Sequence, residues 1–120
     1  MATMALEGIT VLDLTRLLPG AFCSQIMADL GADVIKIEQP EGGDYNRAFL
    51  PLAKKESGSF LLLNRNKKSV ALNLKTEEGK QVFRDLVATA DVVLEGFRPG
   101  VMDRLGLSYN KLALINPKLV

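Results

Sequence analysis

Two short apolar runs on either side of an amphipathic segment constrain the fold more than any other feature of this sequence. Residues 9–14 (ITVLDL) and 33–38 (DVIKIE) are rich in β-branched side chains and have the length of buried strands. Residues 21–30 between them repeat apolar side chains at a spacing of four, which predicts a helix. A strand, a helix and a strand within about 30 residues predict a right-handed parallel βαβ unit.

The predicted helix has one strongly apolar face. Phe22, Ile26 and Leu30 share that face and are expected to point into the core. Cys23 lies beside them, so we interpret it as a packing residue rather than a nucleophile. Gly31 follows the last apolar residue and is expected to end the helix in the left-handed conformation.

The rest of the chain continues the alternation of strands and helices. We expect, in order, a long loop at 39–59, a strand at 69–74, a helix at 76–90, a strand at 91–95 and a short helix at 108–115. Thr76 is the expected N-cap of the longer helix and Ser108 that of the shorter one. The alternation predicts an α/β fold with a mostly parallel sheet, which binds ligands at the carboxyl ends of its strands. Residues 117–120 resemble the lead-in to a further strand, so we expect the natural chain to continue.

Composition limits the functions that this chain can serve by itself. With 120 residues, 48% of them apolar and 24% charged, residues 1–120 have the size and composition of one globular domain. A net charge of +1 gives no bulk attraction to nucleic acid, and no apolar run has the roughly 18 residues of a membrane span. A single cysteine excludes an intrachain disulfide, and the absence of histidine excludes histidine catalysis by residues of this chain. We also expect no metal site. Residues 1–8 lack the features of a signal peptide, so a cytoplasmic protein is expected.

The turn at 15–20 is the first candidate for a ligand site. A helix N-terminus attracts phosphate, and dinucleotide-binding folds carry a glycine-rich fingerprint at this place. This turn has only Gly20, although Glu38 ends the second strand where a ribose-binding acid would lie. Binding of a nicotinamide or flavin cofactor is therefore a minor alternative, beside a plain connection broken at Pro19-Gly20.

Two basic segments are further candidates for binding an anion. The turn at 64–68 (NRNKK) and Lys75 could hold a phosphate, but a solvated turn is the more ordinary interpretation of such a cluster. Lys75 is better placed, because it follows a strand. In the turn at 95–100, Arg98 offers a planar fork to a phosphate, and Arg104 converges on the same anion if a short helix intervenes. A structural turn with a surface arginine is the alternative.

Two other features are compatible with more than one role. Asp13 interrupts the first strand pattern, either as a catalytic carboxylate or, more simply, as a buried acceptor for loop amides. Gly42, Gly43 and Asp44, with Arg47, form either a lid over a site or a solvent loop with a local salt bridge.

Taken together, these segments resemble one protein family. The resemblance is carried by residues 6–16 (LEGITVLDLTR), 28–38 (ADLGADVIKIE) with Pro40 and Gly43-Asp44, 64–69 (NRNKKS), 72–75 (LNLK), 97–101 (FRPGV) and 104–106 (RLG). The sequence is thereby similar to the class III CoA-transferases, the CaiB/BaiF family, which includes α-methylacyl-CoA racemase. The resemblance covers nearly the whole chain. It implies the N-terminal part of a large Rossmann-like domain in an interlocked homodimer.

The resemblance also implies a site for coenzyme A, bound as acyl-CoA substrate and not as a permanent cofactor. Carried over by position, its contacts are Leu18, Pro19, Gln39, Leu72, Asn73, Leu74, Lys75, Gly96, Phe97, Arg98 and Arg104. Two of them depart from the family's pattern. Many members have arginine in place of Gln39, and some transferases have asparagine in place of Gly96. The form with Gly96 is closer to the racemase branch.

The family's catalytic aspartate is expected beyond residue 120, so we expect this chain to hold no catalytic residue and to be inactive alone. In the transferases that aspartate attacks the acyl-CoA, and CoA passes to a carboxylic acid through a mixed anhydride and an aspartyl-CoA thioester. In the racemases an aspartate and a histidine exchange the α-proton of the thioester. The expected function is transfer of CoA between carboxylic acids; racemisation, and CoA binding without catalysis, are the alternatives.

Overall fold

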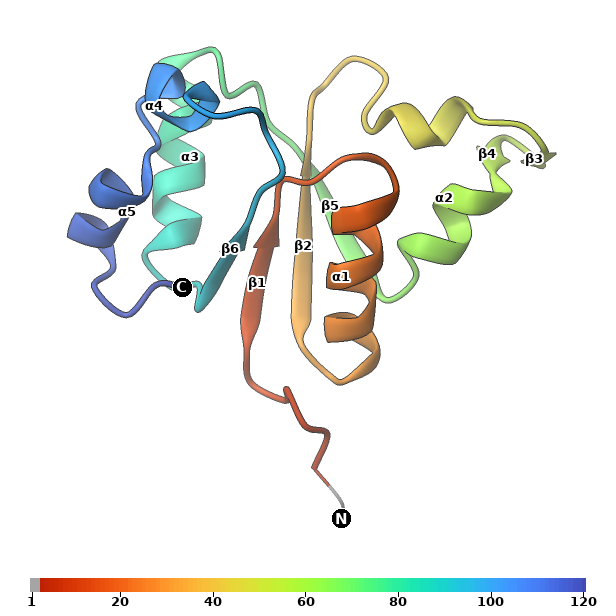
Figure 1. Cartoon of the computed structure of the whole chain (residues 1–120), viewed down its shortest axis with the longest axis horizontal. Helices are drawn as coiled ribbons and strands as arrows, with labels where there is room; N and C mark the ends of the chain where they lie inside the picture. The colour runs from red at the N-terminus through yellow and green to blue at the C-terminus, as the bar shows by residue number, and fades with distance from the viewer. Residues whose placement is uncertain (1–2) are drawn as a thin grey trace.

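Four parallel strands form the centre of the structure, a computed structural model that describes residues 3–120 (Figure 1). The strands are β1 (Thr10–Asp13), β2 (Asp33–Glu38), β5 (Lys67–Ala71) and β6 (Val92–Leu94). The helices are α1 (Leu17–Asp29), α2 (Gly58–Leu63), α3 (Glu77–Val87), α4 (Val101–Leu105) and α5 (Tyr109–Ile115). Between β2 and α2 lie the 3-10 helix η1 (Tyr45–Ala48) and the antiparallel strands β3 (Leu52–Ala53) and β4 (Glu56–Ser57). Residues 1 and 2, which belong to the segment 1–8 that was expected not to be a signal peptide, lie outside the described residues.

The strand order is β5-β2-β1-β6, and every neighbouring pair in this sheet is parallel. In register, Val11 of β1 lies between Val34 of β2 and Val92 of β6. From β1 the chain moves outward to β2 and β5, and then crosses back to place β6 on the other side of β1. The predicted α/β fold with a mostly parallel sheet is confirmed. Its switch point, where ligands bind in open α/β sheets, lies between β1 and β6.

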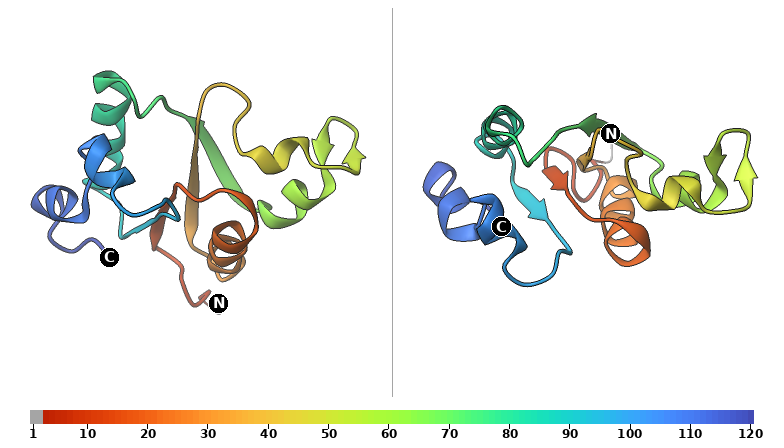
Figure 2. Two further views of the ribbon diagram at one scale, coloured as in Figure 1. Left: turned by 45° about the horizontal axis from the view of Figure 1, so that its top comes forward. Right: turned by 90° about the horizontal axis from the view of Figure 1, so that it is seen from above.

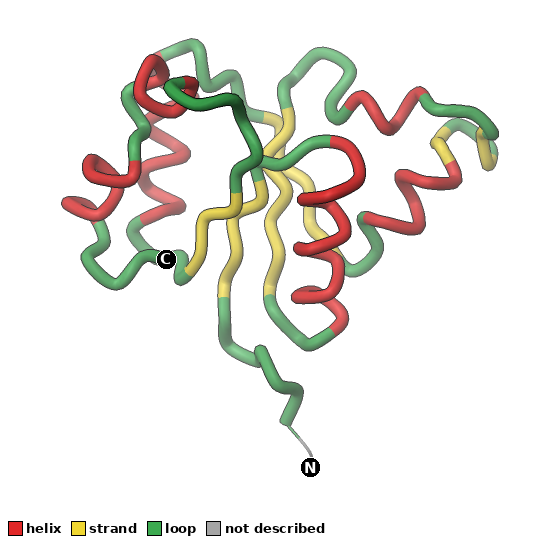
Figure 3. Tube along the Cα trace, viewed as in Figure 1, coloured by secondary structure: helices red, strands yellow, loops and turns green. Residues whose placement is uncertain are grey.

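Helices cover both faces of the sheet, α1 one face and α3 with α5 the other (Figures 1 and 2). The side chains of β1 alternate between these layers: Val11 belongs to the cluster of Ala28, and Leu12 to the larger cluster of Phe83 and Leu112. Figure 3 shows that the segment from η1 to α2 extends on the side away from α3 and α5. The central sheet is therefore sandwiched, while this segment borders it at one end.

The ends of the helices agree with the predictions except at the start of α1. Ser108 is the N-cap residue of α5, but its side chain makes no capping hydrogen bond. Helix α1 begins at Leu17, four residues before the predicted start, and it takes Pro19 into its first turn, where a missing amide costs no intrahelical hydrogen bond. At its other end Gly31 has a φ of 100°, as predicted. Thr76 caps α3, because its hydroxyl oxygen accepts a hydrogen bond from the Gly79 amide at 3.2 Å.

The predicted core face of α1 is wrong. Phe22, Ile26 and Leu30 are 52%, 43% and 44% exposed, and Cys23 is exposed as well, so it is not a packing residue. The helix instead buries Ala21, Ser24, Gln25 and Ala28. Small side chains on this face let the helix lie close to the sheet. The large apolar side chains are left on the outer surface of the described residues.

The segment between β2 and β5 is more structured than a long loop. It contains η1, the hairpin of β3 and β4, and helix α2, which takes in residues 60–63. Strand β5 also begins earlier than predicted, so Lys67 and Lys68 are strand residues rather than part of a turn.

Val120 continues the sheet beside β6. Its amide donates to the Asp91 carbonyl at 3.0 Å, and its carbonyl accepts from the Val93 amide at 2.9 Å. This is the hydrogen-bond pattern of a parallel strand. The interpretation of residues 117–120 as the lead-in to a strand agrees with this pairing.

Candidate functional site

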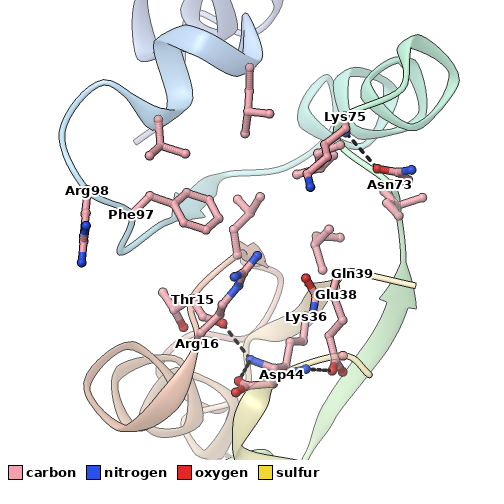
Figure 4. A pocket seen from close by; sticks show the side chains of 17 residues that line it. Thr15, Arg16, Lys36, Glu38, Gln39, Asp44, Asn73, Lys75, Phe97 and Arg98 are labelled. Carbon is pink, nitrogen blue, oxygen red and sulfur yellow. Dashed lines mark hydrogen bonds and ion pairs between the residues drawn. The ribbon is translucent and has the colours of Figure 1, made fainter. Parts of the chain in front are cut away.

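A pocket of about 360 Å³ opens at the carboxyl ends of the parallel strands (Figure 4). Each strand contributes the residues that follow it: Thr15 and Arg16 after β1, Gln39 after β2, Leu72 to Lys75 after β5, and Phe97 with Arg98 after β6. The pocket therefore takes its walls from loops held by a rigid sheet. Ligand sites in this architecture are built in the same way.

Most of the residues predicted as ligand contacts meet in this pocket. Those that line it are Gln39, Leu72, Asn73, Leu74, Lys75, Phe97 and Arg98. They come from three segments that are far apart in the sequence and are brought together because β2, β5 and β6 run parallel in one sheet and end on the same side of it. This geometry is what a common ligand site requires.

The other predicted contacts lie outside the pocket lining. Leu18 is 61% exposed in the first turn of α1, next to Pro19. Gly96 precedes the lining residue Phe97. Arg104 lies in α4, a short helix that follows Arg98 as predicted. The side chains of α4 that line the pocket are apolar, and Arg104 is not among them.

The pocket carries an excess of positive charge. Among residues 3–120, Arg16, Lys75 and Arg98 have no carboxylate oxygen within 4.0 Å. The two acidic residues of the lining, Glu38 and Asp44, are both paired with cations. Much of the remaining lining is apolar. This combination suits a ligand that has anionic groups and a flat apolar part.

Glu38 is fully engaged by the protein. Arg47 donates two hydrogen bonds to its carboxylate, at 2.8 Å and 2.7 Å, and Ser69 and the Asp44 amide donate at 2.7 Å and 2.8 Å. Burial by itself would raise the pKa of this carboxyl group, but these donors outweigh burial and lower the pKa to about 2. Because no acceptor position is left for a ribose hydroxyl, Glu38 does not serve as the ribose-binding acid of a nicotinamide site.

The segment at 42–47 forms part of the pocket wall rather than a free solvent loop. Gly43 and Asp44 line the pocket, and Arg47 forms the local salt bridge with Glu38. Gly43 has a φ of 61°, and a Cβ there would overlap the Glu38 carboxylate. A glycine is therefore required for this close approach.

A buried ion pair in the pocket lining was missed by sequence reasoning. The Lys36 ammonium is 2.8 Å from Asp44 Oδ2 and donates to the Thr15 carbonyl at 2.9 Å. Asp44 Oδ1 accepts from the amides of Leu17 at 3.2 Å and Asn46 at 2.9 Å. The pair thus joins the loop after β1 to the loop after β2. A lysine in the middle of an apolar strand was the available signal.

Asp13 has a structural role. It is fully buried, and its carboxylate accepts hydrogen bonds from the Thr15 amide at 2.9 Å, from the Thr15 and Ser24 hydroxyls, and from Lys67 Nζ at 3.3 Å. Burial lowers the pKa of Lys67, an effect that the Asp13 charge partly opposes. Of the two interpretations of Asp13, the acceptor for loop amides is the one that the contacts support.

The basic segment at 64–68 does not contribute to the pocket. Lys67 is buried against Asp13, and Arg65 and Lys68 pair with aspartates elsewhere on the described surface. Lys75, by contrast, lines the pocket. This agrees with the position assigned to Lys75 after a strand, while its role as a ligand contact stays a prediction.

Two further classes of site are not found in the described part of the chain. Residues 3–120 contain no group of three or more His, Cys, Asp or Glu side chains placed to hold a metal ion. None of the helices in that range has the length and hydropathy needed to cross a membrane.

Comparison with known proteins identifies the family of this sequence. The model of CoA-transferase family III matches residues 6–120. The acetyl-CoA:oxalate CoA-transferase of Acetobacter aceti is 49% identical over 95% of this chain and 29% of its own length. The β subunit of succinyl-CoA–L-malate CoA-transferase from Chloroflexus aurantiacus is 43% identical over 98% of this chain and 29% of its own. The chain thus spans less than a third of the length of these curated relatives.

The fold agrees with a solved structure of the same group. A CAIB/BAIF family protein from Brucella suis superposes with a TM-score of 0.92 and 42% identity, over 99% of this chain and 32% of that one. The expected Rossmann-like α/β architecture is therefore that of solved relatives.

Proposed function

This chain belongs to CoA-transferase family III, and from this premise we propose that the whole protein transfers CoA from an acyl-CoA to a carboxylic acid. The residues in this chain would supply much of the CoA site. The observation that carries the proposal is the pocket at the switch point, where Arg16, Lys75 and Arg98 lie beside apolar walls and form no ion pair within residues 3–120. CoA has anionic phosphates and a flat adenine, and this pocket offers a counterpart for each.

The reaction would use an aspartate that lies beyond residue 120. Its carboxylate attacks the thioester carbonyl, which gives a mixed anhydride and CoA thiolate, and the thiolate then forms an aspartyl-CoA thioester. That thiolate attack would release the donor carboxylate. The acceptor carboxylate would then attack the aspartyl-CoA thioester to give a second mixed anhydride and CoA thiolate, and attack of the thiolate on the acceptor's acyl carbon would form the new acyl-CoA and release the aspartate. The relatives named above use different acceptors, oxalate and malate, so we leave the acceptor open. We also propose a cytoplasmic homodimer, on the basis of the family resemblance.

Racemisation of an α-methylacyl-CoA is the second candidate, and Gly96 is the observation that favours it.

Incubating the full-length protein with acetyl-CoA and a panel of carboxylic acids that includes oxalate tests the first candidate. New thioesters are measured by chromatography and mass spectrometry. Incubation of 2-methylacyl-CoA in deuterium oxide tests the second. Deuterium at the α-carbon without any new thioester would reject transfer and support racemisation.

Replacing Arg98 by alanine in the full-length enzyme is expected to raise the KM for acyl-CoA about tenfold, since a charged hydrogen bond is lost. Arg104→Ala should have a smaller effect, because Arg104 lies outside the pocket lining. Steady-state kinetics measure both. Arg84→Ala is the matched control, because Arg84 lies on α3 outside the pocket lining and its guanidinium interacts with Gln81 and Glu77 of the same helix. Unchanged kinetics in both Arg98→Ala and Arg104→Ala would contradict the prediction that these arginines bind the phosphates of CoA.

The isolated chain of residues 1–120 is expected to bind CoA weakly, with a dissociation constant of about 1 mM or higher. The reason is that the proposed site is completed by later segments and by a partner subunit. Isothermal titration calorimetry measures the affinity, and circular dichroism checks that the chain is folded. Micromolar binding by a folded chain would show that the site is complete without those parts.

A further inference from the structure

Arg16 occupies a position in the pocket that the predicted contacts do not include. It follows β1, and its NH1 group donates to the Tyr45 hydroxyl at 3.1 Å. Its guanidinium carbon lies 5.2 Å from the centre of the Tyr45 ring and 5.5 Å from that of Phe97. Figure 4 shows its side chain among those that line the pocket. Three loops, after β1, β2 and β6, thus meet at this one side chain.

The contacts of Arg16 orient its guanidinium without neutralising it. Aromatic rings attract a cation through their faces but leave its N–H groups free to donate. A guanidinium has five N–H donors, and the Tyr45 hydroxyl takes one of them. The pocket's own carboxylates are not available, because Glu38 is held by Arg47 and Asp44 by Lys36. The remaining donors of Arg16 are therefore free for a ligand.

The backbone next to Arg16 is fixed as well. Leu17 has a φ of 62°, a left-handed conformation that is unfavourable for a residue with a side chain. The Leu17 amide donates to Asp44, whose carboxylate is held by the buried Lys36. Such a conformation persists only where surrounding contacts enforce it. The buried pair thus sets the direction in which Arg16 leaves the main chain.

We propose that Arg16 is an additional anion-binding residue of this pocket, and that its free N–H groups bind the oxygens of a phosphate or carboxylate on the ligand. This inference rests on the proposed CoA-transferase function. The planar fork of arginine matches both groups, whereas the ammonium of lysine offers a point charge without the fork or the stacking. Tyr45 is a positioning residue, because it holds the guanidinium between its own ring and Phe97.

The test compares Arg16→Gln, Arg16→Lys and Tyr45→Phe in the full-length protein. Calorimetry measures the affinities for CoA, 3′-dephospho-CoA and oxalate, the last as a carboxylate probe. We expect Arg16→Gln to weaken at least one of these by about tenfold. Arg16→Lys should recover only part of the loss. Tyr45→Phe keeps the ring and should lose less than Arg16→Gln does.

The pattern of losses identifies the anion. A loss for CoA that disappears with 3′-dephospho-CoA assigns Arg16 to the 3′-phosphate. An equal loss with both assigns it to the diphosphate, and a loss confined to oxalate assigns it to the acceptor carboxylate. Each of these patterns supports the inference.

Two results would overturn the inference, and they are distinguishable. In the first, wild-type protein binds CoA, and Arg16→Gln binds CoA and oxalate with the same affinities as wild type. Arg16 is then not an anion contact, while the proposed function stands. If wild-type protein binds no CoA, the proposed function fails and the inference fails with it. Arg84→Gln is the matched arginine control, and thermal unfolding checks that each variant is folded.

Discussion

Replacing Asp13 by alanine is expected to lower the free energy of unfolding by about 3–5 kcal/mol, a large share of the stability of an ordinary domain. The Asp13 carboxylate is fully buried and accepts hydrogen bonds from Thr15, Ser24 and Lys67. Its removal leaves the Lys67 ammonium, whose side chain is 2% exposed, without a counter-ion. It also leaves the Thr15 amide without its acceptor at the edge of the pocket. Urea denaturation of the full-length protein measures the loss.

A second substitution separates the charge from the shape of the site. Because replacing both members of a buried pair removes the uncompensated charge, Asp13→Asn with Lys67→Met should be more stable than Asp13→Ala. Asp85→Ala is the matched control: Asp85 is exposed on α3, contacts only Gln81, and should change stability by less than about 0.5 kcal/mol. A loss below about 1 kcal/mol in Asp13→Ala would show that the pair is not needed for folding.

The order and type of the main elements could be predicted because local pattern and sheet topology agree. Residues 33–38 form β2 as predicted, and Thr76 caps α3. The face of α1 could not be predicted in the same way. The spacing of its large apolar residues indicates a helix and shows that these residues share one face. It does not show which face of the helix packs on the sheet. The helix turns its small residues to the sheet, and the larger ones, such as Phe22, remain exposed.

The candidate site was predicted in part, for a physical reason. Residues that follow parallel strands meet at one edge of the sheet, so Lys75 and Arg98 could be placed together from their positions alone. The buried pair of Lys36 and Asp44 could not, because the partners belong to a strand and to a loop whose path the sequence does not specify. The same holds for Arg16, whose aromatic neighbours come from two other loops.

The stability of the protein is expected to fall by about 2–3 kcal/mol as the pH decreases from about 5 to 2, owing to Glu38. Its pKa is lowered from an ordinary value of 4.5 to about 2. A depressed carboxyl pKa means that the folded state prefers the ionised form. The contribution is therefore complete above about pH 4.5 and is lost as the pH falls through 2. Part of the Coulombic effect is screened, since the Arg47 side chain is 29% exposed.

Glu38→Gln isolates this contribution, because glutamine has the shape of glutamate without its charge. The variant should be about 2–3 kcal/mol less stable than wild type at pH 7, and the difference should shrink steadily between pH 4.5 and pH 2. Urea denaturation at a series of pH values measures both curves. Glu77→Gln is the control, because that carboxylate lies in solvent beside Lys80 and an exposed pair contributes little. A difference that stays constant over the whole range would mean that Glu38 acts through the hydrogen bonds that its two oxygens accept rather than through its charge. In that case the wall of the pocket would hold together in acid, and any loss of ligand binding there would have to come from protonation of the ligand.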